Sequence, residues 1–191
     1  DDLTGLATGG NKTRKLEFLL ADALQQGCDC VITAGGPQSN HCRQTAAAAA
    51  SLGLDCHLVL GGIAPHPPQG NLFLDHLLGA TVHWTEKPLR NQLMDSLAAA
   101  LRDQARRPYA IPIGGSNGIG AVGYVLAMTE LVGQLADMNV AVDEIYVATS
   151  SGSTQAGMAL GNALTKCAGR VAGISIDLSP AEKFESEIAS I

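Results

Sequence analysis

The run Cys30-Val31-Ile32-Thr33-Ala34 is followed directly by Gly35-Gly36-Pro37 and then by a helical pattern from about Ser39 to Leu52. A nearly continuous apolar run of this length is typical of a strand that is covered on both faces of a parallel sheet. The glycine–proline turn ends the strand, and a glycine at position 53 closes the helix. This strand–turn–helix unit predicts the architecture of the remaining sequence.

The same alternation of strand and helix recurs along the chain. Further strands are predicted at 56–60, 81–85, 109–113, 144–149 and 171–176. Further helices are predicted between Asn11 and Gly27 and at 71–78, 91–106, 121–135 and 154–167, with a last one opened by the capping box Ser179-Pro180-Ala181-Glu182. Such alternation indicates an α/β fold built on a parallel sheet.

Composition and charge argue against a nucleic-acid partner and a membrane span, and they favour a reducing compartment. The 191 residues are 46% hydrophobic and carry a net charge of −6 without a basic run, which argues against a nucleic-acid partner. No apolar stretch is expected to reach the roughly 20 residues that span a bilayer. Five cysteines, without C-x-x-C spacing or a signal peptide, favour a reducing cytoplasm. Both ends look cut, so we expect a piece of a longer protein.

The first loop with unusual chemistry is Gly9-Gly10-Asn11-Lys12, which opens the first helix. Asn11 is a candidate N-cap, and Lys12 then lies in the first turn, where a cation opposes the helix dipole. This position, together with burial, lowers the pKa of an ammonium, and lysines of lowered pKa form Schiff bases. The alternative is a solvated lysine after a glycine turn.

The second loop, Gly35 to His41, joins the first strand to its helix. Helix-start amides and the side chains of Gln38, Ser39 and Asn40 suit a carboxylate or a ring hydroxyl. The alternative is ordinary N-capping by Ser39 or Asn40. His41 fits a structural or solvated histidine better than a catalytic one.

The third loop runs from Thr149 to Gly157 and places small hydroxyl residues around a glycine at a helix start. Consecutive amides in such a loop close on an anion, which predicts a phosphate site, with a simple polar turn as the alternative. The loop has no lysine in Walker position. A fourth stretch, Gly118 to Gly123, matches the dinucleotide fingerprint, but the next strand ends in serines rather than in an acidic residue.

A Schiff-base lysine, a phosphate loop and a polar loop together suit a cofactor that carries an aldehyde and a phosphate, which is pyridoxal phosphate. At three motifs the sequence resembles the D-cysteine desulfhydrase and 1-aminocyclopropane-1-carboxylate deaminase family, a branch of the tryptophan-synthase-β-like, fold-type II pyridoxal phosphate enzymes. The motifs are Gly9-Gly10-Asn11-Lys12-Thr13-Arg14-Lys15-Leu16-Glu17, Gln38-Ser39-Asn40-His41 and Gly152-Ser153-Thr154-Gln155-Ala156-Gly157.

The resemblance implies a role for each matching residue. Lys12 would carry the cofactor covalently, and Lys15 would approach its phosphate or the active site. Ser39 would be the active-site serine, Asn40 would bind the ring hydroxyl, and Gln38 would lie beside the substrate carboxylate. The phosphate would be held by Ser151, Gly152, Ser153 and Thr154.

The resemblance also implies a three-layer αβα fold in two domains, cut at both ends, and a homodimer. Residues 16–112 would form a smaller mobile domain, and residues 1–15 and 113–191 would belong to the larger cofactor-binding domain. The family's pyridine-nitrogen partner and active-site tyrosine would lie beyond Ile191.

The implied activity is α,β-elimination on a small amino acid. The stretches Thr8 to Leu19 and Gly114 to Val125 look closer to D-cysteine desulfhydrases and L-cysteate sulfo-lyases than to the deaminases. Ring-opening deamination of 1-aminocyclopropane-1-carboxylate remains the alternative within the family. Two alternatives belong to other classes of function. One is a nucleotide-binding module that uses Gly118 to Gly123, and the other is an inactive homologue that only binds cofactor.

Overall fold

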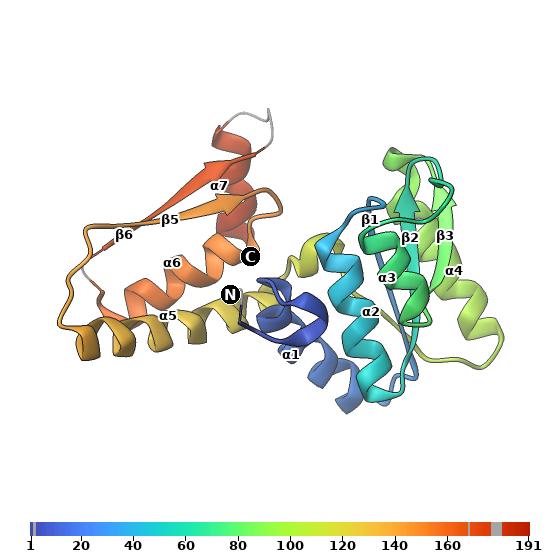
Figure 1. The fold of residues 1–191 in the computed structure, drawn as a ribbon, viewed down its shortest axis with the longest axis horizontal. Coiled ribbons are helices and arrows are strands. Elements are labelled where there is room, and N and C mark those ends of the chain that lie inside the picture. Colours follow the sequence, from blue (N-terminus) through green and yellow to red (C-terminus); the bar gives the residue numbers. More distant parts are fainter. Residues whose placement is uncertain (2, 168, 177–180) are drawn as a thin grey trace. The chain divides into compact units, whose positions relative to one another are not determined.

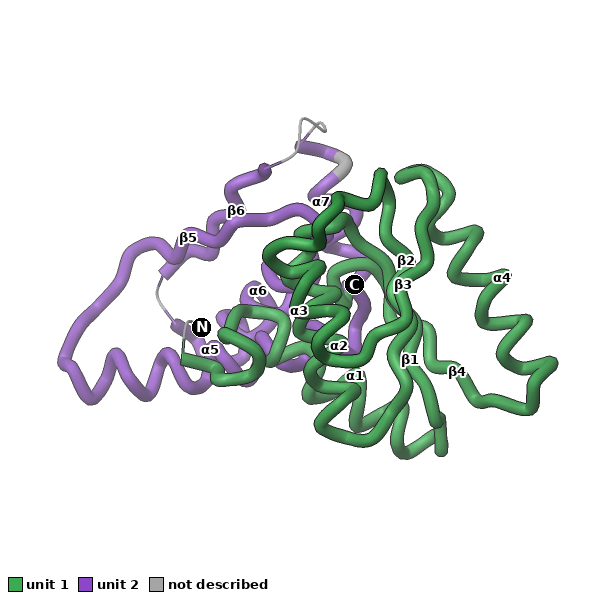
Figure 2. The backbone as a smooth tube through the Cα atoms, turned by 45° about the vertical axis from the view of Figure 1, so that its right-hand side comes forward, with its two compact units in different colours: residues 1–115 green, residues 116–191 purple. Residues whose placement is uncertain are grey.

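The computed structural model describes residues 1, 3–167, 169–176 and 181–191. These residues form two compact units, residues 1–115 and residues 116–191 (Figure 2). Each unit is built on parallel strands (Figure 1), which confirms the α/β prediction.

The first unit holds a four-stranded parallel sheet in the order β3-β2-β1-β4. Its strands are β1 (Cys30–Gly35), β2 (Asp55–Gly61), β3 (Thr81–Thr85) and β4 (Pro108–Ala110). Its helices are α1 (Lys12–Gln25), α2 (Asn40–Leu52), α3 (Asn71–Leu77) and α4 (Arg90–Asp103), with short 3-10 turns η1 (Leu6–Thr8), η2 (Lys87–Leu89) and η3 (Ile113–Gly115).

Alternate residues of β1 enter two different cores, and every β1 residue is buried. Val31 joins a core formed with α1, α2 and α3, which includes Leu16, Leu19 and Leu72. Cys30, Ile32 and Ala34 join a second core, which is closed by Met94, Ala98 and Leu101 of α4. Helices therefore cover both faces of this sheet, which is the three-layer arrangement expected of buried parallel strands.

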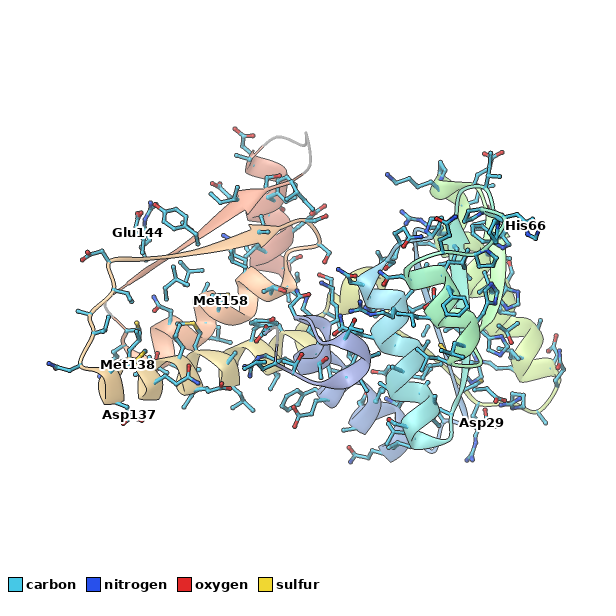
Figure 3. The ribbon with its side chains drawn as sticks, in the orientation of Figure 1. Asp29, His66, Asp137, Met138, Glu144 and Met158 are labelled. Atoms are coloured by element: carbon cyan, nitrogen blue, oxygen red, sulfur yellow. The ribbon has the colours of Figure 1, made fainter. Side chains whose placement is uncertain are left out.

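The second unit consists of α5 (Gly118–Met138), β5 (Glu144–Thr149), α6 (Ser153–Thr165), β6 (Arg170–Ser175) and α7 (Ala181–Ser190). Strands β5 and β6 are parallel, from the pair Glu144 and Arg170 to the pair Thr149 and Ser175. Met158 of α6, labelled in Figure 3, packs against Tyr124 and Met128 of α5. The expectation of strands buried on both faces is wrong for these two strands, because Tyr146 is 63% exposed and Ile174 is 53% exposed.

Several element boundaries differ from the sequence expectations, by up to three residues. Strand β4 ends at Ala110 instead of 113, because Pro112 has no amide to donate to a ladder. Helix α4 ends at Asp103 instead of 106, and Ala105 follows with a positive φ of 60°. Helix α5 starts at Gly118 instead of 121, because the Asn117 side chain accepts from the Gly120 amide at 2.9 Å. Of the predicted capping box, Ser179 and Pro180 lie outside the described residues.

Helix α5 contradicts the expectation that no apolar stretch reaches the length needed to span a bilayer. By length and composition alone it is long and apolar enough to cross a membrane. Core helices of soluble proteins pass the same test, and one face of α5 packs on α6.

The predicted domain boundary at 112/113 lies three residues from the division between the two units. Residues 1–15, predicted to belong to the larger domain, fall in the first unit, where α1 continues without a break through Lys15 and Leu16. The domain organisation of a complete protein stays a prediction.

The contact between α5 and α6 depends on a glycine and gives a first test. A Cβ at Gly161 would lie 2.7 Å from Met128 Cβ and 2.9 Å from the Val125 carbonyl oxygen, whereas a Cβ at Gly133 would meet no atom within 4 Å. We expect Gly161→Ala to lower the free energy of unfolding by about 1–3 kcal/mol through overpacking. The matched control Gly133→Ala should raise it by about 0.5–1 kcal/mol. Thermal unfolding of the complete protein measures both, and equal stability of the two variants would contradict this packing.

Candidate active site

Lys12 is the first residue of α1 and is partly buried. Burial lowers the pKa of its ammonium below the ordinary lysine value, which is the direction that the sequence predicted. Asn11 is the N-cap residue of α1, as predicted, but its side chain makes no cap hydrogen bond. Instead, Asn11 Oδ1 accepts a hydrogen bond from Lys12 Nζ at 3.2 Å.

Lys15 lies one turn further along α1 and is only 1% exposed. Its Nζ donates to the carbonyl oxygen of Gly114 at 3.2 Å. Burial, followed by the charge of Lys12, lowers the pKa of Lys15 to about 7. Two lysines in successive turns of α1 are therefore biased toward the neutral amine.

The Gln38–Asn40 loop joins β1 to α2, as predicted. Ser39 is the N-cap of α2, and its Oγ accepts from the Cys42 amide at 3.2 Å. Asn40 Oδ1 accepts from Asn71 Nδ2 at 2.8 Å. Gln38 accepts from the Asn71 amide at 3.0 Å and donates to the Gln69 carbonyl at 3.0 Å. The capping alternative is thus correct for Ser39, whose O–H remains able to donate.

His41 is a buried residue of α2, and its hydrogen bond to Thr33 determines its tautomer. Thr33 Oγ1 donates to the Ile111 carbonyl at 2.9 Å, so it accepts from His41 Nε2 at 2.8 Å, and Nε2 carries the proton. Nδ1 has no partner among the described residues. Burial, with the charges of Lys12 and Lys15, lowers the pKa of His41 to about 3.

The predicted phosphate loop is the start of α6 in the second unit. Gly152 is the N-cap of α6, without a side-chain cap, and Ser153 is fully buried. The Ser153 amide donates to Ser116 Oγ at 3.3 Å, and that hydroxyl contacts the Ser151 carbonyl oxygen. The buried Oγ1 of Thr149, at the end of β5, has no partner within the described part of the chain.

The dinucleotide-like stretch Gly118 to Gly123 lies inside the first two turns of α5. It does not follow a strand directly, because η3 and Asn117 precede it. Asn117 caps this helix start with its own side chain. These features disfavour the nucleotide-binding alternative, whose fingerprint requires a glycine turn directly between a strand and a helix.

Within the first unit α1, which carries Lys12 and Lys15, packs against α2, whose first turn and N-cap carry Asn40 and Ser39 directly after Gln38. The residues Ser151, Gly152, Ser153 and Thr154 lie in the second unit. A common site formed by both sets stays a prediction.

The sequence reasoning missed Thr33, Arg43 and Asn71, which hold the site residues of the first unit. Arg43 was visible only as a basic residue in an alanine-rich helix, and Asn71 only as a helix start. Their contacts reach residues 28 to 34 positions away, and no local pattern signals them. None of the five cysteines forms a disulfide within the described residues.

Comparison with known proteins identifies the family. The family model described as "Pyridoxal-phosphate dependent enzyme" matches residues 1–187, so the chain belongs to the pyridoxal-phosphate-dependent enzymes. A D-cysteine desulfhydrase of Serratia proteamaculans (strain 568) is 48% identical over 168 residues, covering 84% of this chain and 51% of that protein. A putative 1-aminocyclopropane-1-carboxylate deaminase of Pyrococcus abyssi (strain GE5 / Orsay) is 41% identical over 194 residues, covering 100% of this chain and 58% of that protein.

Solved structures agree with this fold. The structure of an ACC deaminase homologue matches with a TM-score of 0.88 and 40% identity, covering 100% of this chain and 59% of that one. A threonine deaminase, at a TM-score of 0.68 and 21% identity, shares the fold. The chain spans about half the length of the curated relatives that it matches.

The described residues fit pyridoxal phosphate, the cofactor of this family. Lys12 supplies an amine of lowered pKa, which is the group that condenses with an aldehyde. The start of α6 supplies helix amides beside the buried, unpartnered hydroxyl of Thr149, a donor set suited to a phosphate. Asn40 supplies an exposed amide at the start of α2, suited to a ring hydroxyl.

The buried neutral His41 predicts acid sensitivity. Its folded pKa of about 3 lies below the ordinary 6.5, so its contribution to stability is present above pH 6.5 and is lost as the pH falls toward 3. In that window the loss approaches about 1.4 kcal/mol per pH unit. His41→Gln should flatten the fall, although the lowered pKa values of His57 and His83 act in the same direction.

Urea unfolding of the complete protein at a series of pH values between 7 and 4.5 measures this slope. The control His76→Gln, at an exposed histidine of α3, should keep the wild-type slope. An unchanged slope in His41→Gln would mean that His41 is not held neutral by burial.

Proposed function

We propose that the complete protein is a pyridoxal-phosphate-dependent lyase that catalyses α,β-elimination on a small amino acid, of the D-cysteine desulfhydrase type. The observation that carries the proposal is the partly buried Lys12 at the start of α1, whose pKa is lowered by burial. An accessible amine whose pKa is lowered, on a helix that packs against α2, suits covalent binding of an aldehyde cofactor.

Bound pyridoxal phosphate would supply an electron-withdrawing ring that stabilises negative charge at Cα. Lys12 would hold the cofactor covalently, and its free Nζ would accept the Cα proton of the substrate. Its lowered pKa increases the unprotonated fraction of Nζ at a given pH, which favours this step. Ser39 and Asn40, with Gln38 beside them, would bind the substrate carboxylate and the ring hydroxyl through their side chains and the α2 helix start.

The phosphate would be bound by Ser151, Gly152, Ser153 and Thr154, where the positive end of the α6 dipole favours an anion. Lys15 would approach the phosphate or the active site, and an anion next to its buried Nζ would raise the lowered pKa of that amine. A protonated Lys15 would then stabilise the phosphate rather than react with the aldehyde.

For D-cysteine the balanced reaction takes up one water and releases pyruvate, ammonia and hydrogen sulfide. The identity to curated D-cysteine desulfhydrases, 48% over 168 residues for the Serratia protein, supports this substrate. L-cysteate, which would release sulfite, fits the same elimination. The candidate from another reaction type is deamination of 1-aminocyclopropane-1-carboxylate, which the match to the Pyrococcus protein favours.

We further propose a cytoplasmic homodimer whose partners are small amino acids, without a nucleic-acid or membrane partner. The acidic net charge of −6 supports the exclusion of nucleic acid. Residues 16–112 would form the smaller mobile domain of the complete protein, and residues 1–15 and 113–191 would belong to the larger one.

Removing the Lys12 amine tests the proposal. We expect Lys12→Ala to abolish turnover and the visible absorbance of covalently bound cofactor, because no amine at this position remains to bind it. Lys87→Ala, at an exposed lysine of η2, is the matched control and should keep both. A fully active, yellow Lys12→Ala protein would overturn the assignment, and a colourless wild type would favour another class of function.

Product analysis separates the candidate substrates. The complete protein is assayed with D-cysteine, L-cysteate and 1-aminocyclopropane-1-carboxylate, and pyruvate, sulfide, sulfite and 2-oxobutanoate are quantified. We expect the highest kcat/KM for D-cysteine. Faster formation of 2-oxobutanoate than of pyruvate would establish the deaminase instead, and a coloured protein that turns over none of them would indicate an inactive homologue.

A further inference from the structure

Arg43 connects two segments that the proposed site needs. It lies in the first turns of α2 and is only 8% exposed. Its Nη2 donates to the Gly9 carbonyl at 2.7 Å, three residues before Lys12. Its Nη1 donates to Asn71 Oδ1 at 3.3 Å, at the start of α3. A planar guanidinium reaches two acceptors in fixed directions at once, which a lysine ammonium on a flexible stem does less well.

Asn71 continues this connection to the loop before α2. Its Nδ2 donates to the Gln38 carbonyl at 2.8 Å and to Asn40 Oδ1 at 2.8 Å. Its backbone amide donates to Gln38 Oε1 at 3.0 Å. The side chain therefore accepts through Oδ1 and donates through Nδ2, a combination that an amide has and an ionised carboxylate lacks.

Two neighbouring contacts strengthen the connection. Gln44, next to Arg43, accepts through Oε1 from the Thr13 amide and from Thr13 Oγ1, both at 2.9 Å. Asp75, one turn after Asn71 on α3, is fully buried close enough to Arg43 for the guanidinium charge to act on its carboxyl group. These hydrogen bonds join α2 to the start of α1, and Arg43 of α2 interacts with both Asn71 and Asp75 of α3.

The exposed side chain of Asn40 explains why such a connection matters. An exposed asparagine samples several rotamers, and fixing it on binding costs conformational entropy. The bond from Asn71 holds Asn40 Oδ1 in one place before any ligand arrives, which leaves the Asn40 amide nitrogen free to donate toward a ligand acceptor.

We propose that Arg43 and Asn71 are positioning residues, which fix the Gly9–Lys12 segment and the Gln38–Asn40 loop relative to each other so that Lys12 and Asn40 meet the same bound cofactor. This inference rests on the proposed function, since it assigns Lys12 and Asn40 to pyridoxal phosphate. Neither residue touches the reacting atoms in this account, and both act through the segments that they hold.

The variant Asn71→Asp separates the two ends of the connection. A carboxylate at this position still accepts from Arg43, but it faces the oxygens of Gln38 and Asn40 without a donor. We expect the dissociation constant of pyridoxal phosphate, from absorbance titration of the complete protein, to rise about tenfold, which corresponds to roughly 1.4 kcal/mol of binding free energy. The exposed control Asn91→Asp in α4 should bind cofactor as the wild type does.

A double-mutant cycle distinguishes positioning from general stabilisation. If Asn71 acts through Asn40, then Asn71→Asp added to Asn40→Ala should weaken cofactor binding by less than threefold, although it weakens the wild type about tenfold. Strictly multiplicative effects of the two substitutions would overturn the positioning role. An unchanged dissociation constant in Asn71→Asp alone would overturn it as well.

Two further measurements cover loss of folding and loss of the proposed function. If Asn71→Asp does not fold, Arg43→Lys keeps the charge near Asp75 and should weaken cofactor binding at near-wild-type thermal stability; wild-type binding by this variant would overturn the proposal. Hydrogen exchange of the cofactor-free protein should be faster at residues 38–40 in Asn71→Asp, and unchanged exchange would overturn the connection itself. A wild type that binds no pyridoxal phosphate, with this exchange effect present, would overturn the proposed function and the assignment to the cofactor but not the connection.

Discussion

The first unit buries two basic side chains, and the backbone turns around them supply the hydrogen-bond acceptors that these side chains require. Lys15 and Arg43 are almost excluded from solvent, and a buried charge needs replacements for its lost water. Backbone carbonyls supply them, from Gly114 to Lys15 and from Gly9 to Arg43. Gly9 and Gly114 have φ values of 75° and 73°, in the region that favours glycine, so both turns depend on the absence of a side chain.

Burial also lowers the pKa values of the lysines that are candidates for the covalent bond to the cofactor. Because the carbonyl oxygens only partly replace water, the pKa values of Lys12 and Lys15 fall, and both amines are biased toward the neutral form. The pKa of Lys15 is the more strongly shifted, and its buried Nζ donates to the Gly114 carbonyl, whereas Lys12 is partly exposed at the helix start. The shift in pKa alone would favour Lys15 as the reactive amine, and accessibility favours Lys12. We assign the covalent role to Lys12 because a cofactor must reach the amine.

Features that depend on neighbouring residues could be predicted from the sequence. The β1–α2 unit, the parallel sheet and the direction of the Lys12 pKa shift follow from local patterns, and the structure agrees with all three. Asn11 occupies the predicted N-cap position, but its side chain accepts from Lys12 Nζ instead of from a helix amide, which the local pattern does not reveal. The exposure of β5 and β6 was also missed, since an apolar sequence does not reveal whether a strand face is covered in the residues described. Arg43 and Asn71 could not be identified, because their partners lie 28 to 34 residues away.

The assignment of the covalent anchor can be tested without any substrate. The complete protein, loaded with pyridoxal phosphate, is reduced with borohydride, digested and examined by mass spectrometry for the lysine that carries the pyridoxyl group. The account predicts modification of Lys12, with Lys15 unmodified. Modification of Lys15 or of another lysine in place of Lys12 would contradict it.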